Sequence, residues 1–219
     1  MRLLYINPNA TRTMTDDMVA VAQAHVPQAE VIGWTNTDGP PSIQGVADGQ
    51  AALPGILAML PKARLAGADA IVIGCFDDTG LAQMRERAHC PVIGIGQAAY
   101  VTAALLGQRF SVVTTLDVSV PILRDNIETL GFAPHCTAVR ASGISVLAVE
   151  EGSEETRARL ATEINIAAKE DQIATVVLGC AGMAPLAGDL SRRTSVKLID
   201  GVAASAGLAG HLVQMVRPR

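Results

Sequence analysis

One short pattern, an apolar strand that ends in Gly-Cys, occurs twice in this chain of 219 residues. Residues 71–75 read IVIGC and residues 176–180 read VVLGC, at an offset of 105 positions. The same offset aligns PVIGIG at residues 91–96 with VKLIDG at residues 196–201. One offset that serves several elements indicates two pseudo-equivalent halves, although apolar strands also resemble one another by chance.

Strand-like apolar runs alternate with alanine-rich, helix-like segments along the whole chain. We predict strands at residues 3–7, 30–34, 70–74, 92–95, 110–114, 137–141, 175–178 and 197–199. We predict helices at residues 13–25, 50–66, 80–88, 97–106, 119–130, 154–171, 184–192 and 202–216. Such alternation is typical of βαβ units, so the predicted fold class is α/β with mostly parallel sheets flanked by helices.

The internal offset also predicts how the chain divides. The first α/β lobe is expected at residues 1–107, because Gly107 is a natural residue to end a helix. The second lobe is expected at residues 108–219, with its last helix, 202–216, crossing back to pack on the first lobe.

Composition and charge exclude several classes of protein. The net charge is −4 and no basic cluster exceeds two residues, which gives nucleic-acid binding little support. No apolar run approaches the roughly 18–20 residues of a membrane span, and the first residues lack the features of a signal peptide. We therefore expect a cytoplasmic protein whose partner is a small molecule, with neither nucleic acid nor membrane.

The four cysteines form no Cys-x-x-Cys pair, so we expect no disulfide framework and no metal site. Cys75 and Cys180 each follow an apolar strand, and the carboxyl ends of parallel strands face the ligand crevice. Backbone N–H groups at the next helix are expected to lower the thiol pKa from about 8.5 toward neutrality. A thiolate on one lobe and a thiol on the other would act as base and acid. The alternative is that both cysteines are small buried hydrophobes.

Other polar residues fall at the same edge of the predicted sheets. Asn9 follows the first strand, and Thr114 and Thr115 follow the opening strand of the second lobe. Asp77 and Asp78 follow Cys75; we expect one of them to cap a helix and the other to contact substrate or to order the loop. The stiff turn at residues 39–43 is expected to form a lip over the cleft.

Taken together, these motifs resemble the aspartate/glutamate racemase superfamily and, within it, the hydantoin racemase group, which includes allantoin racemases. The motifs that carry the resemblance are INPNAT at 6–11, GPPSIQG at 39–45, GCFDDTGL at 74–81, PVIGIGQAA at 91–99, RFSVVTTL at 109–116 and LGCAGM at 178–183. The resemblance implies two Rossmann-like lobes with the active site in the cleft between them. It also implies racemisation by Cys75 and Cys180 without cofactor or metal, in a homo-oligomer.

The resemblance further implies which residues surround the substrate. They are Asn9, Ser42, Phe76, Asp77, Asp78, Thr79, Thr114, Thr115, Ala181 and Gly182. One position departs from the family pattern, because Gln97 stands where glutamate is often found. The lost charge is expected to alter the polarity of the cleft or the contacts between subunits.

The loops near the predicted cleft contain hydroxyls, amides and two aspartates but neither arginine nor lysine. A free amino acid needs its carboxylate bound, so this composition favours a 5-substituted hydantoin or a related cyclic ureide as substrate. The alternatives are an allantoin racemase or an amino-acid racemase of the aspartate/glutamate type, and then an enzyme similar to maleate isomerases or a sensor without catalysis. Decarboxylases of the superfamily need only one of the two cysteines, and this chain has both.

Overall fold

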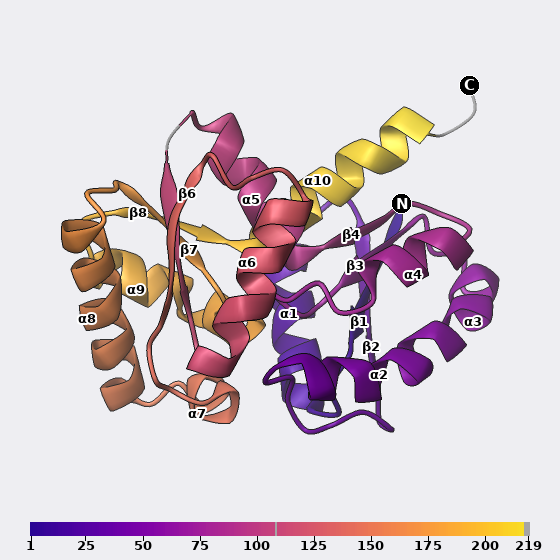
Figure 1. The fold of residues 1–219 in the computed structure, drawn as a ribbon. Coiled ribbons are helices and arrows are strands. Elements are labelled where there is room, and N and C mark those ends of the chain that lie inside the picture. Colours follow the sequence, from indigo (N-terminus) through magenta and orange to yellow (C-terminus); the bar gives the residue numbers. More distant parts are fainter. Residues whose placement is uncertain (108, 217–219) are drawn as a thin grey trace.

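The computed structural model describes residues 1–107 and 109–216, and within them it contains two separate four-stranded sheets (Figure 1). All neighbouring strands run parallel, in the orders β2-β1-β3-β4 and β6-β5-β7-β8. The strands of the first sheet are β1 (Arg2–Asn7), β2 (Glu30–Thr35), β3 (Ala70–Ile73) and β4 (Val92–Gly94). Those of the second are β5 (Phe110–Thr114), β6 (Cys136–Ala141), β7 (Thr175–Leu178) and β8 (Lys197–Asp200).

The second sheet repeats the strand order of the first, and helices flank both (Figure 1). The predicted fold class, α/β with parallel sheets in two similar halves, is confirmed. The helices are α1 (Arg12–His25), α2 (Val46–Ala58), α3 (Leu60–Leu65), α4 (Leu81–Arg87), α5 (Ile95–Leu105), α6 (Val120–Thr129), α7 (Val146–Glu151), α8 (Glu154–Glu170), α9 (Ala187–Arg193) and α10 (Gly201–Val216). Two 3-10 segments, η1 (Asp117–Ser119) and η2 (Ala181–Leu186), precede α6 and α9.

The predicted helix at residues 50–66 is wrong in its extent. The structure begins this helix earlier, at Val46, and breaks it at Met59 into α2 and α3. Pro61 lies in the first turn of α3, where its missing N–H costs nothing, whereas in one continuous helix it would remove an interior hydrogen bond. The sequence also gave no prediction of α7, whose six residues are too few to show a clear helical period.

The last helix joins the two halves. α10 follows β8 of the second sheet, yet it packs against α1, α5 and β3 of the first half. The Tyr5 hydroxyl on β1 lies 2.8 Å from the Ser205 hydroxyl and donates to the Val202 carbonyl over 3.2 Å. Gly107 has a φ of +68°, which ends α5 in the left-handed region that glycine favours. The division of the chain at residue 107 stays a prediction.

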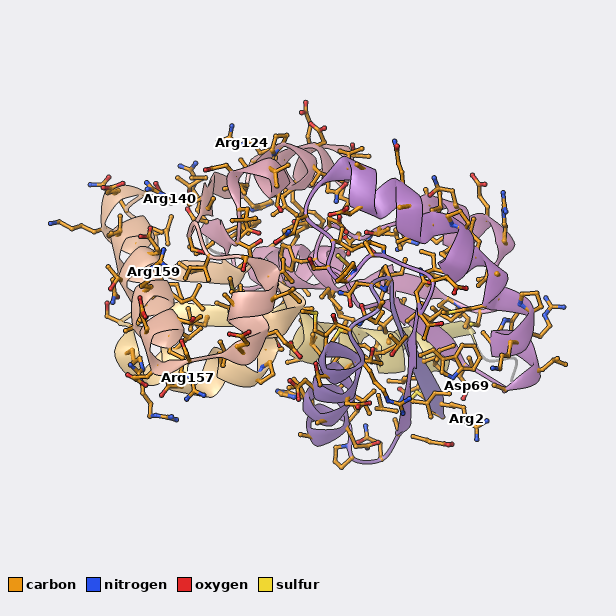
Figure 2. The ribbon with its side chains drawn as sticks, turned by 90° about the horizontal axis from the view of Figure 1, so that it is seen from below. Arg2, Asp69, Arg124, Arg140, Arg157 and Arg159 are labelled. Carbon is orange, nitrogen blue, oxygen red and sulfur yellow. The ribbon has the colours of Figure 1, made fainter. Side chains whose placement is uncertain are left out.

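Hydrogen bonds from charged residues join segments at the ends of strands and helices near the surface. The Arg2 amide donates to the Asp69 carboxylate over 2.7 Å, so the start of β1 is bonded to the residue just before β3. In the other half, the Arg140 guanidinium donates to Asp171 and Glu170. Figure 2 shows the labelled Arg2 and Asp69 at one outer end of the molecule and Arg140 at the other. Within residues 1–107 and 109–216, no helix combines the length and the apolar character that crossing a bilayer requires.

The two glycines that precede Cys75 and Cys180 differ in how tightly they are packed. A Cβ atom on Gly179 would lie 2.9 Å from the Val113 carbonyl oxygen and from the Thr114 Cβ, whereas on Gly74 it would chiefly meet the flexible end of Met18 at 2.7 Å. We expect Gly179→Ala to lower the free energy of unfolding by about 1–3 kcal/mol, the usual cost of overpacking, and Gly74→Ala to lower it less. Urea unfolding of both variants tests this, and an equal or larger loss for Gly74→Ala would contradict it.

Candidate active site

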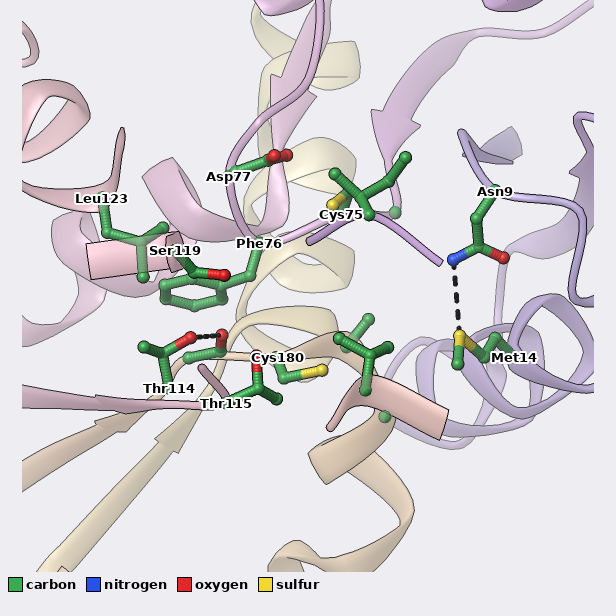
Figure 3. A pocket seen from close by; sticks show the side chains of 16 residues that line it. Asn9, Met14, Cys75, Phe76, Asp77, Thr114, Thr115, Ser119, Leu123 and Cys180 are labelled. Atoms are coloured by element: carbon green, nitrogen blue, oxygen red, sulfur yellow. Dashed lines mark hydrogen bonds between the residues drawn. The ribbon is translucent and has the colours of Figure 1, made fainter. Parts of the chain in front are cut away.

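The two cysteines lie where the strand order places them, each just after an inner strand of its sheet. Cys75 follows β3 and Cys180 follows β7, and the strands beside them, β1 and β5, lead into Asn9 and Thr115. These strand ends surround one cavity, with Cys75 and Cys180 on opposite sides of it (Figure 3). The residues of the two similar halves are therefore brought together at a shared space, as the internal offset predicts.

The cavity has a volume of about 40 Å³. Of the residues proposed from sequence, those that line it are Asn9, Cys75, Phe76, Asp77, Thr114, Thr115, Cys180, Ala181 and Gly182. Sequence reasoning did not single out Met14, Ile43, Gly74, Ser119, Leu123, Val146 or Gly179 as lining residues. No sequence signal separates the apolar residues of this set from core residues, because a leucine or methionine that lines a cavity has the same periodic pattern as one that packs in the core.

Three residues proposed from sequence do not line the cavity. Ser42 is buried in the turn beside Ile43, which does line it. Thr79 donates its hydroxyl and its amide to Asp77 Oδ1, so it orders the loop. Asp78 turns toward the start of α5, where it accepts hydrogen bonds from two backbone amides. Asp78 is thus the aspartate that caps a helix, and Asp77 is the one at the cavity.

Gln97 also lies outside the cavity lining. Its side-chain Oε1 accepts a hydrogen bond of 2.5 Å from Arg85 Nη2. Arg85 in turn donates its Nε to the Val92 carbonyl on β4 over 2.9 Å. The Gln97 side chain therefore contacts Arg85 and not the cavity. Any effect of this residue on the polarity of the cleft is transmitted through Arg85 and the start of α5.

Asn9 and Thr114 are held by hydrogen bonds that fix their side chains. Asn9 Oδ1 accepts from the Thr11 amide over 2.9 Å, while its Nδ2 donates to the Met14 sulfur over 3.4 Å, and sulfur is a weak acceptor (Figure 3). This amide can therefore turn a donor toward a ligand. The Thr114 hydroxyl donates to the Gly179 carbonyl over 2.8 Å and so fixes the residue before Cys180.

The turn at residues 39–43 contributes Ile43 to the cavity lining, and its role as a lip stays a prediction. Its carbonyls at Pro40 and Pro41 accept from the Ala10 amide and the Thr11 hydroxyl at the start of α1. The next residue after the turn reaches the second half, because Gln44 Oε1 accepts a hydrogen bond of 3.2 Å from the Val146 amide at the start of α7. Ile43 and Val146 both line the cavity, so this bond joins two segments of its wall.

The expectation that loop amides lower the pKa of Cys75 is wrong. Burial raises the pKa of the Cys75 thiol well above its ordinary value, and the negative charge and hydrogen bond of Asp77 raise it further. Burial also raises the pKa of Asp77, although hydrogen bonds from Cys75 and Thr79 oppose that rise. The Asp77 carboxyl therefore opposes ionisation of the Cys75 thiol.

The pKa of Cys180 is raised as well, to about 11, chiefly by burial. Here the amides do act in the predicted direction, since the N–H groups of Gly182 and Met183 at the start of η2 donate to the sulfur and favour the thiolate. They do not outweigh desolvation. The environments of the two thiols are unequal. The Asp77 carboxyl raises the pKa of Cys75 by its charge and by a hydrogen bond, against one amide donor, whereas Cys180 has two amide donors and is affected by Glu150 and Asp77 only through their charges.

The wall of the cavity is poor in cations. Among the described residues that line it, none is arginine or lysine, and Asp77 is the one with an acidic side chain. The labelled arginines of Figure 2 lie at the outer parts of the molecule. Within residues 1–107 and 109–216, no group of three or more His, Cys, Asp or Glu side chains is arranged to hold a metal ion.

Comparison with known proteins adds to this geometry. The model of the family described as Asp/Glu/Hydantoin racemase matches residues 3–209. A hydantoin racemase from Rhizobium meliloti is 44% identical over 217 residues, which covers 97% of this chain and 89% of the relative. The allantoin racemase structure from Klebsiella pneumoniae superposes with a TM-score of 0.93 at 39% identity, covering 98% of this chain and 88% of that one. The allantoin racemase structure from Pseudomonas fluorescens gives a TM-score of 0.90 at 33% identity, covering 98% and 92%.

The unequal environments predict that the two thiols ionise in a fixed order. We expect Cys180 to reach half of its limiting alkylation rate near pH 11 and Cys75 to do so at higher pH, because Asp77 opposes the Cys75 thiolate. Iodoacetamide labelling at a series of pH values, read peptide by peptide by mass spectrometry, measures both midpoints.

The matched control for this order is Asp77→Asn, which removes the adjacent charge and leaves a side chain of the same shape. This variant should shift the midpoint of Cys75 to lower pH by more than it shifts that of Cys180. A midpoint near pH 7 for either thiol in the unsubstituted protein would contradict the account.

Proposed function

Because the chain belongs to the Asp/Glu/Hydantoin racemase family, we propose that it racemises 5-substituted hydantoins or a related cyclic ureide, with Cys75 and Cys180 as the proton-transfer groups. Its enzyme class, a racemase, follows from the relatives that it matches along nearly its whole length. The observation that carries the proposal is the pair of thiols, from equivalent positions of the two halves, on opposite sides of one cavity (Figure 3).

The geometry supplies one proton-transfer group for each face of a carbon. One cysteine, as thiolate, removes the C5 proton; the C–H bond breaks and its electron pair passes into the adjacent ring carbonyl as an enolate. The other cysteine, as thiol, gives its proton to the opposite face of C5, and the electron pair returns to form the new C–H bond. The product is the mirror-image ring, and the thiol and thiolate have exchanged roles.

Both thiols keep their protons at rest, because burial raises both pKa values, so one of them must ionise before it can act as the base. Amide donors favour the thiolate of Cys180, and we assign Cys180 as the thiol that ionises for the first proton abstraction. Cys75 keeps its proton beside the Asp77 carboxylate and is the acid. In the reverse direction Cys75 must be the thiolate, and Asp77 can take up a proton because burial already raises the pKa of its carboxyl group.

Electrostatics favour a neutral ring over a dicarboxylic amino acid. The lining has no cationic side chain among its described residues, and a substrate carboxylate would lie beside the acidic side chain of Asp77. Asn9 can donate its Nδ2 to a ring carbonyl, where an enolate oxygen would develop charge. A ring imide also makes the C5 proton easier to remove than that of a free amino acid.

Substrate binding requires the cavity to widen. A volume of about 40 Å³ has room for about three water molecules, which is less than a substituted five-membered ring needs. The hydrogen bond from Val146 to Gln44 joins the two halves beside two lining residues, Ile43 and Val146, so its breaking would free the turn at residues 39–43 to move. Closure of the lip over the bound ring would then exclude water during proton transfer.

Allantoin is the second candidate substrate, since it is itself a cyclic ureide and the allantoin racemase of Klebsiella pneumoniae is 39% identical to this chain. Racemisation of aspartate or glutamate is disfavoured by the missing cation. Chemistry like that of maleate isomerases would use a cysteine as a nucleophile and would leave no solvent hydrogen exchange at a stereocentre. That the protein is cytoplasmic and that it forms a homo-oligomer both stay predictions.

The substrate class is tested by following optical rotation with an L-5-substituted hydantoin, allantoin and L-aspartate in separate reactions. We expect rotation to be lost with one or both ureides and to persist with aspartate. In deuterium oxide, the hydantoin should take up one solvent deuterium at C5 as it racemises. Activity on aspartate alone, or racemisation without deuterium uptake, would contradict the proposal.

A further inference from the structure

Asp78 belongs to the loop that carries Cys75, but its carboxylate points away from the cavity. The side chain is buried, with 6% of its surface exposed. Oδ1 accepts a hydrogen bond of 2.9 Å from the Gly96 amide, and Oδ2 accepts one of 2.7 Å from the Gln97 amide. The two amides belong to the first turn of α5, so the loop between β3 and α4 is bonded to the helix that follows β4.

The first turn of α5 lacks a cap of its own. Its N-cap residue is Gly94, which has no side chain to accept from the unpaired amides of the helix. Asp78 supplies the missing acceptor from a distant part of the chain, and the positive end of the helix dipole favours its negative charge. Burial raises the pKa of Asp78 to about 8, while the two amide hydrogen bonds and the Arg85 guanidinium oppose that rise.

Two glycines allow this close contact. A Cβ atom on Gly94 would lie 1.8 Å from Asp78 Oδ1, and one on Gly96 would lie 2.3 Å from the Phe76 carbonyl oxygen. Neither distance is compatible with a side chain. Asp78 itself adopts a φ of +54°, in the left-handed region, which is uncommon for a residue other than glycine. The two hydrogen bonds from the Gly96 and Gln97 amides hold it in this conformation.

In the second half, the equivalent helix is capped by a residue that lies outside the Cys180 loop. The first turn of α10 is capped by Asp200, the last residue of β8, which accepts from the Val202 and Ala203 amides over 3.2 and 2.8 Å. At the 105-residue offset, the position of Asp78 is occupied by Met183. The Cys180 loop therefore has no carboxylate that bonds it to the neighbouring helix, and the two loops are held differently.

We propose that Asp78 is a positioning residue for Cys75, which fixes the Cys75 loop on α5 and thereby sets the rate of proton transfer at the Cys75 face of the substrate. This inference rests on the proposed two-cysteine racemisation. Asp78 does not line the cavity, so in this proposal it acts on proton transfer only through the loop backbone. Its effect is confined to one face because the Cys180 loop has no equivalent contact.

The test compares Asp78→Asn with Asp200→Asn. Asparagine keeps one acceptor oxygen but turns an NH2 group toward the second amide of the helix, so each variant loses part of the cap of one helix. Each enantiomer of the hydantoin is incubated separately in deuterium oxide, and the initial loss of the C5 proton is followed by NMR. The enantiomer that a Cys75→Ser variant fails to exchange identifies the Cys75 face.

In Asp78→Asn, proton loss from the Cys75-face enantiomer should fall by about 10- to 100-fold, the usual effect of a displaced catalytic group, and by much less from the other enantiomer. Asp200→Asn should change both rates by less than about twofold, because its cap lies outside both cysteine loops. A merely structural role would lower both rates together. Equal losses at the two faces, or no loss at either, would overturn the inference.

A second variant keeps the test decisive if Asp78→Asn fails to fold. Gly94→Ala leaves Asp78 in place but puts a methyl group where its carboxylate lies, and it should produce the same one-sided loss. If the unsubstituted enzyme exchanges neither enantiomer, the proposed function itself fails. If the unsubstituted enzyme is active and the Gly94→Ala variant loses both faces equally, the proposed function stands and the role of Asp78 fails.

Discussion

Close packing at the end of β7 fixes where Cys180 lies, whereas Gly74, at the equivalent point after β3, is packed chiefly against the flexible end of Met18. Gly179 lies so near the Val113 carbonyl and the Thr114 side chain that a Cβ atom could not be added without displacing one of them. Because Gly179 packs closely against β5 at the end of β7, the next residue, Cys180, leaves the sheet at its carboxyl edge. The strand–Gly–Cys pattern, repeated in both halves, puts one thiol on each side of a single cavity.

Burial then determines the chemistry that these thiols can perform. Desolvation raises the pKa of both, so neither is a stable thiolate in the resting protein. Their neighbours differ, with amide donors at Cys180 and a carboxylate at Cys75. The pseudo-symmetric fold thus carries an asymmetric pair, which the racemisation needs, because at any moment one group must accept a proton while the other gives one.

Much of the architecture was predictable from the sequence, since the strand–Gly–Cys repeat and the alternation of elements report the parallel sheets directly. The same alternation predicted several of the cavity-lining residues, because they lie at or just after the carboxyl ends of strands: Asn9, Cys75, Thr114, Thr115 and Cys180. Met14, Leu123 and Val146 were not, because an apolar residue that lines a cavity has the same pattern as one in the core. The pKa shift of Cys75 was predicted with the wrong sign, since sequence shows which amides are near but not how completely the thiol is buried. Asp78 was placed at the substrate because nothing local indicates that its partner is a backbone amide 18 residues later.

The central claim is that each cysteine serves one face of the substrate, and single Cys75→Ser and Cys180→Ser variants test it most directly. Each enantiomer of a 5-substituted hydantoin is followed separately in deuterium oxide for racemisation and for exchange of the C5 proton. Both variants should lose racemisation, and each should lose exchange from a different enantiomer. Full racemisation by both variants, or loss of exchange from the same enantiomer in both, would contradict the two-cysteine account.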